Sequence, residues 1–126
     1  MKTTRLSDEP DTRSPAGAEV RFMMEGATGG MIHCSLLPFQ INKAVMLQSM
    51  SFGMCCGHGE IWRDNGIDSF VTTLTKGASI DIQPNAVFQY RNVLSEPLIF
   101  ICMRMPSWPD NSEAIYVDKG KWVSTV

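Results

Sequence analysis

Short apolar or alternating segments fill the sequence from residue 19 onward, and Gly, Pro, Asn or Asp interrupts them about every ten residues. This spacing is typical of strands joined by turns. The predicted strands are residues 19–24, 30–37, 43–48, 50–56, 60–63, 69–74, 79–82, 87–92 and 97–105. No window of about eleven residues has a helical period free of glycine or proline, so the pattern predicts an all-β sandwich or barrel.

The turn residues indicate how these segments connect. Asp64-Asn65-Gly66 lies between two predicted strands and favours the positive backbone angles of a tight turn, which predicts a hairpin over residues 57–72. Residues 1–18 have almost no large apolar side chain, and such a composition cannot offset the entropy cost of ordering. We therefore expect a flexible arm over residues 1–18 and one barrel domain over residues 19–126.

Composition and charge exclude several classes of partner. The chain has 126 residues and a formal charge of -2, with no basic stripe that would neutralise phosphates, so nucleic acid is not expected to bind. The longest uninterrupted apolar stretch, Leu98–Met103, is far shorter than the ~20 residues of a membrane-spanning helix, so no membrane is expected as a partner. Acidic residues and a proline follow Met1–Arg5 where a secretory signal would be apolar. These features predict a cytoplasmic protein with reduced cysteines.

Several segments together resemble the core of small single-domain cupins. They are Gly57-His58-Gly59-Glu60-Ile61-Trp62-Arg63, residues 77–85 and residues 88–92, followed by residues 96–100 and 105–109. Each segment alone is a weak signal, but their order and spacing are more specific, and the resemblance covers about residues 20–122. It implies a double-stranded β-helix, which is a jelly-roll barrel.

The first metal-binding motif of cupins has two histidines and a glutamate before a glycine. Gly57 matches that glycine, which places Met50 at the glutamate position and Ala44 and Met46 at the two histidine positions. None of these three side chains is a usual ligand of Fe, Mn, Ni or Zn.

The second motif of the family has its third histidine ahead of an asparagine. Gly77 and Asn92 match this motif, whereas the proline and glycine positions hold Gln83 and Asn85, and the histidine position is Phe88. All four ligand positions implied by the resemblance are thus apolar. We expect neither a metal ion nor another cofactor. Cu(I) bound by the Met46 and Met50 thioethers is the alternative, although methionine in a core more often fills gaps.

Strand alternation extends the expected lining of the barrel, since residues two apart share a face. Counted from the ligand positions, the inward-facing set is Ala44, Met46, Gln48, Met50, Phe52, Met54, Cys56, Phe88 and Tyr90. Most of this set is apolar, which predicts a hydrophobic pocket for a small apolar or aromatic molecule. The predicted substrate-binding residues are Ala44, Met46, Met50, Phe52, Met54 and Phe88. The same side chains are also large enough to fill a barrel completely.

Three polar residues are candidates for catalysis in this pocket. Tyr90 and Gln48 would place a hydroxyl and an amide among apolar side chains, and His33 could transfer protons near neutral pH. Cys55 and Cys56 point to opposite faces of a strand, so a shared metal ion is not expected there.

Three function classes are consistent with these observations. The first is a metal-independent enzyme, an isomerase, cyclase or lyase acting on a hydrophobic substrate. The second is a module that binds or senses a small molecule without changing it. The third is a metal-dependent cupin with ligands at unusual positions. A small barrel has a limited core, so a homodimer is also expected.

Overall fold

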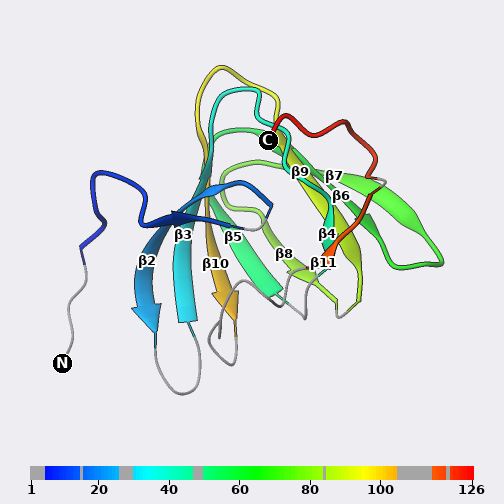
Figure 1. Cartoon of the computed structure of the whole chain (residues 1–126), viewed down its shortest axis with the longest axis horizontal. Helices are drawn as coiled ribbons and strands as arrows, with labels where there is room; N and C mark the ends of the chain where they lie inside the picture. Colours follow the sequence, from blue (N-terminus) through cyan, green and yellow to red (C-terminus); the bar gives the residue numbers. More distant parts are fainter. Residues whose placement is uncertain are drawn as a thin grey trace.

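The structure is a computed structural model that describes residues 5–14, 16–25, 30–46, 50–83, 85–104, 115–118 and 120–126. The side chains of residues 24, 25, 50–52, 54, 55 and 104 lie outside this description. The described residues form strands and turns without a helix (Figure 1). The strands are β1 (Thr12–Arg13), β2 (Glu19–Glu25), β3 (Gly30–Leu36), β4 (Val45–Met46), β5 (Met50–Cys56), β6 (Gly59–Asp64), β7 (Ser69–Leu74), β8 (Ser79–Ile82), β9 (Val87–Asn92), β10 (Leu98–Arg104) and β11 (Ile115–Tyr116).

The strands form two antiparallel sheets that face each other (Figure 1). One sheet has the order β1-β2-β3-β10-β5-β8, and the other has the order β11-β4-β9-β6-β7. Consecutive strands alternate between the sheets at several points, as in a jelly roll. The all-β prediction is confirmed, and the predicted hairpin is formed by β6 and β7. Gly66 in its turn has a φ of 89°, which glycine adopts without strain.

Along both inner faces, the solvent exposure of the side chains changes from one end of the barrel to the other. At one end, which we call the closed end, Leu36, Leu74 and Leu98 are each 0% exposed. At the opposite end, which we call the open end, Phe22 on β2 and Phe70 on β7 are 46% and 47% exposed. Apolar side chains therefore seal the closed end, whereas the inner face meets solvent at the open end.

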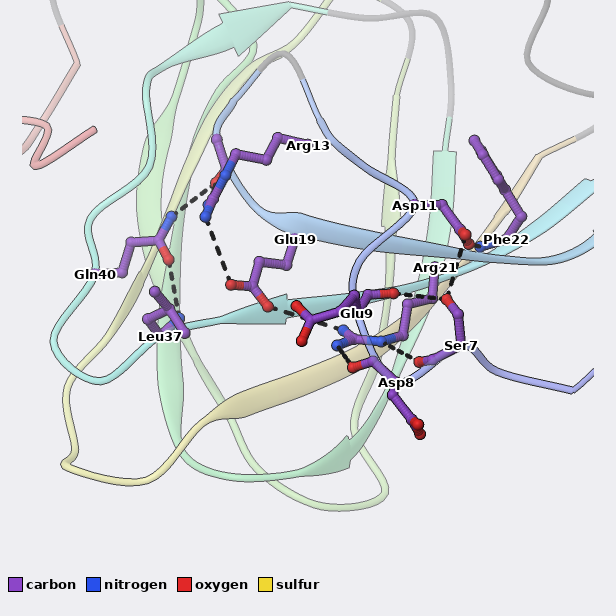
Figure 2. A network of polar contacts seen from close by, with 11 residues as sticks. Ser7, Asp8, Glu9, Asp11, Arg13, Glu19, Arg21, Phe22, Leu37 and Gln40 are labelled. Carbon is purple, nitrogen blue, oxygen red and sulfur yellow. Dashed lines mark hydrogen bonds and ion pairs between the residues drawn. The ribbon is translucent and has the colours of Figure 1, made fainter.

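Part of the predicted arm packs against the barrel. β1 pairs with β2, and Ala16 and Ala18 belong to the hydrophobic core. Figure 2 shows Arg21 of β2 donating from Nε to the Ser7 carbonyl and from Nη2 to the Asp8 carbonyl, both at 2.8 Å. These contacts precede the boundary predicted between residues 18 and 19, which stays a prediction. The flexibility of residues 1–18 stays a prediction.

The C-terminal residues 120–126 lie over the outer face of β9. Gln89 is 1% exposed, and its amide nitrogen donates to the carbonyls of Asn42 and Trp122. The Trp122 amide donates back to Gln89 Oε1 at 3.0 Å. Arg91 lies over the Trp122 ring and binds Glu60 at 2.6 Å. Polar side chains of β9 thus attach the chain end to the barrel.

Among the described residues, none forms a helix that could cross a membrane.

Candidate functional site

Aromatic rings form the centre of the barrel interior. Phe88 and Tyr90 of β9 lie on the inner face, as the alternation predicts, and they are 1% and 5% exposed. The Tyr90 ring lies 5.6 Å from the Phe88 ring and 5.1 Å from the Phe100 ring, measured between centroids. Phe88, at the third histidine position implied by the cupin resemblance, is therefore part of a packed aromatic cluster.

Two thiols lie beside this cluster. The Sγ atoms of Cys34 on β3 and Cys102 on β10 are 3.6 Å apart, and both residues are buried. Burial raises the pKa of Cys102 well above its usual range, and the hydrogen bond with Cys34 adds to the shift. Burial likewise raises the pKa of Tyr90, with smaller contributions from Cys102 and Cys34. At neutral pH Tyr90 and Cys102 are therefore uncharged.

The sequence predicted that Ala44 and Met46 face the barrel interior, and the structure corrects this orientation. Val45, not its neighbours, belongs to the hydrophobic core, and it pairs directly with Phe88. A Cβ added to Gly120 would lie 2.9 Å from the Ala44 Cβ, so Ala44 contacts the C-terminal segment instead. Because alternation puts Ala44 and Met46 on the face opposite Val45, neither lines the interior. Their predicted role in substrate binding therefore has no geometric support.

Most of the predicted lining on the next strand cannot be placed. Gln48 lies outside the described residues, as do the side chains of Met50, Phe52 and Met54. The backbone register places Met50 opposite Ile82 and Phe52 opposite Ile80. Cys56, the last residue predicted to face inward on this strand, is exposed. The roles of the four undescribed side chains stay predictions.

His33 lies away from the interior. Its neighbour Cys34 belongs to the core, so His33 faces outward from β3, beside Arg21 and Ile101 on the adjacent strands. Partial burial lowers the pKa of His33, and the charge of Arg21 lowers it further. The three predicted catalytic residues are thus not brought together: Tyr90 faces inward, His33 faces outward, and Gln48 is undescribed.

Arg63 is the inner-face residue that sequence reasoning missed. It pairs with Phe88 on one side and with Phe70 on the other, and residues opposite each other share a face of the sheet. Phe88 faces the core, so Arg63 does as well. Ile61, two residues earlier, is 0% exposed on the same face. Alternation from Ile61 indicates this orientation, because residues two apart on a strand share a face.

The guanidinium group of Arg63 reaches from one sheet to the other. Nη1 donates to the Asp81 carbonyl of β8 at 3.3 Å, and Nη2 donates to Thr72 Oγ1 of β7 at 3.1 Å. Its central carbon lies 4.5 Å from the centre of the Phe70 ring. Arg63 thus places a positive charge at the open end, among aromatic and aliphatic side chains.

A concave region lies on the outside of the barrel. This outer hollow, of about 690 Å³, is formed by the arm, the loop after β3 and the C-terminal segment. Its lining includes the exposed cations Arg13 and Lys43 and the half-exposed aromatic residues Phe39 and Tyr116. The Lys43 Nζ lies 5.2 Å from the centre of the Tyr116 ring.

Within the described ranges, His, Cys, Asp and Glu form no group of three suited to a metal ion.

Solved structures share this fold, although no family model and no curated protein matches the chain. The Drosophila melanogaster CENP-C cupin domain has a TM-score of 0.61 at 14% identity, covering 78% of this chain and 84% of that one. A Klebsiella pneumoniae protein with a double-stranded β-helix domain has a TM-score of 0.65 at 20% identity, covering 86% and 90%. The Schizosaccharomyces pombe Cnp3 cupin domain has a TM-score of 0.57 at 13% identity, covering 69% and 61%. At these identities the likeness shows the fold alone, which is the cupin-type double-stranded β-helix.

Proposed function

We propose that this cupin-type barrel binds a small apolar or aromatic molecule at the open end of its interior, without a metal ion. The observation that carries the proposal is the gradient of exposure along the inner face. Phe70 is 47% exposed and Leu74 is 0% exposed, although both lie on the inner face of β7. A barrel sealed at one end and accessible at the other suits an apolar ligand.

The chemistry of the inner face supports binding rather than turnover. The sequence favoured an isomerase, cyclase or lyase, each of which needs a group that accepts or donates a proton. Tyr90 and Cys102 have raised pKa values and stay protonated at neutral pH, so neither serves as the proton acceptor. His33 faces outward, and partial burial and the charge of Arg21 lower its pKa. We therefore favour a non-catalytic binding or sensing module.

The fold alone does not choose this function. One structural neighbour is recorded as Drosophila melanogaster CENP-C bound to CAL1, at a TM-score of 0.60 and 14% identity. Cupin barrels thus also occur in protein complexes, and function must be assigned from the site. The accessible inner face with Phe70 and Arg63 is the feature that supports a small-molecule ligand here.

The test compares two neighbouring threonines of β7. Thr72 pairs with Ile61 and faces inward, whereas Thr73 pairs with Glu60 and faces outward. A tryptophan at position 72 would fill the open end, so Thr72→Trp should weaken binding of the neutral fluorophore N-phenyl-1-naphthylamine at least about tenfold. Thr73→Trp, the matched control, should bind it like the parent chain.

Fluorescence titration measures the affinity, and thermal unfolding checks that both variants fold. Saturable binding by the parent chain that only Thr72→Trp weakens supports the proposal. A parent chain without saturable binding contradicts it, as do folded variants with equal affinity.

A further inference from the structure

The Arg63 guanidinium has hydrogen-bond donors that the described residues leave unused. A guanidinium carries five N–H groups, and the bonds to Asp81 and Thr72 use one each. The Nε atom is buried and has no hydrogen-bond partner in the part of the chain that the structure describes. A buried donor without a partner costs free energy, so a ligand atom that accepts from Nε would be favoured.

The positive charge of Arg63 also lacks a carboxylate partner there. Among the described side chains, the ion pairs join Arg13 and Arg21 to Glu19, and Arg91 to Glu60. Arg63 instead lies between the sheets, against the Phe70 ring. A cation removed from water in such surroundings is stabilised by an anion held at hydrogen-bond distance.

The ligand class follows from these two observations. Guanidinium groups bind carboxylates through two parallel N–H···O bonds, which combine charge with fixed geometry. Beside Arg63, the inner face presents Phe70, Phe88 and the buried Ile80 and Ile82 of β8. We propose that the ligand is an apolar or aromatic carboxylate, whose carboxylate binds Arg63 and whose hydrocarbon part lies along the inner face. This inference rests on the proposed function, because it names the ligand of the same site.

The outer hollow is the competing site for such an anion. Its arginine, Arg13, has a side chain that is 55% exposed and already lies 3.6 Å from Glu19. Water and a neighbouring carboxylate weaken the attraction of an exposed cation for a ligand. Arg63, partly buried and without a carboxylate partner among the described residues, is the stronger anion site. Arg13 therefore provides the matched control.

The experiment uses two probes that share one ring system. Naphthalene-1-acetate carries a carboxylate, whereas naphthalene-1-acetamide is neutral and nearly the same size. Isothermal titration calorimetry on the parent chain should show that the acetate binds at least about tenfold more tightly. Arg63→Gln should abolish this preference. Arg13→Gln should keep the preference.

A second measurement records ligand binding on the parent chain itself. In parent protein labelled with 15N-arginine, the acetate should shift the NMR signal of the Arg63 Nε–H group more than the acetamide does at equal occupancy. Arg63→Gln is needed only to assign the signal. If that variant does not fold, Arg63→Lys serves for the assignment, since lysine lacks the Nε–H signal but keeps the charge.

Several outcomes would overturn the inference. If both naphthalene probes bind with equal affinity, the carboxylate has no partner, although the binding proposal stands. If neither binds but N-phenyl-1-naphthylamine does, the ligand class is wrong and the pocket is kept. Loss of the preference in Arg13→Gln would move the site to the outer hollow. If none of the three compounds binds, both the inference and the proposed function fail.

Discussion

At the scale of single residues, burial sets the protonation of the inner-face groups. Tyr90 lies among Phe88, Phe100 and two buried cysteines, where a phenolate would be poorly solvated. The structure therefore changes the role expected for Tyr90. The sequence suggested a catalytic hydroxyl, whereas burial raises its pKa and makes it part of an uncharged core.

This raised pKa has a consequence for stability at alkaline pH. The unfolded chain loses the Tyr90 proton near pH 10, whereas the folded chain keeps it to higher pH. Deprotonation then favours the unfolded state, so the free energy of unfolding falls as pH rises above about 10. Tyr90→Phe should lose less stability than the parent chain between about pH 9 and pH 11, measured by urea unfolding.

The raised pKa of Cys102 also lowers the free energy of unfolding at alkaline pH, in Tyr90→Phe and in the parent chain alike. The difference in pH dependence between the two proteins therefore reports on Tyr90. Tyr116→Phe is the matched control, because Tyr116 is 55% exposed, and this variant should keep the pH dependence of the parent chain. An equal loss of stability in Tyr90→Phe and the parent chain would show that Tyr90 is not shielded from water.

At the scale of elements, the strands were easier to predict than the faces they present. Alternation within β9 correctly placed Phe88 and Tyr90 inside, because both lie on one regular strand. The same counting failed at β4, which has only two residues and is separated from β5 by residues 47–49. The phase of β4 is set by its own pairing with β9, in which Val45 lies opposite Phe88. Val45, not Ala44 or Met46, therefore faces the core.

The attachment of the C-terminal segment to β9 gives a prediction at this scale. The buried Gln89 amide makes three hydrogen bonds, to the Asn42 carbonyl and to both backbone groups of Trp122. Gln89→Leu would leave these groups unpaired, so we expect a loss of about 2–4 kcal/mol in the free energy of unfolding.

Urea unfolding measures that loss. Gln83→Leu, at an exposed position before the turn into β9, should change stability by less than about 0.5 kcal/mol. A Gln89→Leu variant as stable as Gln83→Leu would show that these bonds contribute little and that the segment is held by packing alone.

At the scale of the whole molecule, the barrel was predictable and the site only partly so. Apolar runs separated by turn residues gave the all-β class, and the ordered resemblance to cupins gave the jelly roll, which the two sheets and the solved neighbours confirm. Alternation from Ile61 places Arg63 on the inner face, but its pairing with Phe88 and its bond to the Asp81 carbonyl depend on strands that lie further along the chain. Its isolation from carboxylates in the described part of the chain becomes visible only once both sheets are assembled.

The central claim, an apolar ligand at the open end, is tested most directly by methyl NMR of the parent chain during titration with N-phenyl-1-naphthylamine. Ile32 and Ile80, on inner faces of the six-stranded sheet, should shift in a saturable manner. Leu36, Leu74 and Leu98 at the closed end should stay nearly unchanged. Shifts confined to outer-face methyl groups such as those of Val71, or no shifts at all, would contradict the account.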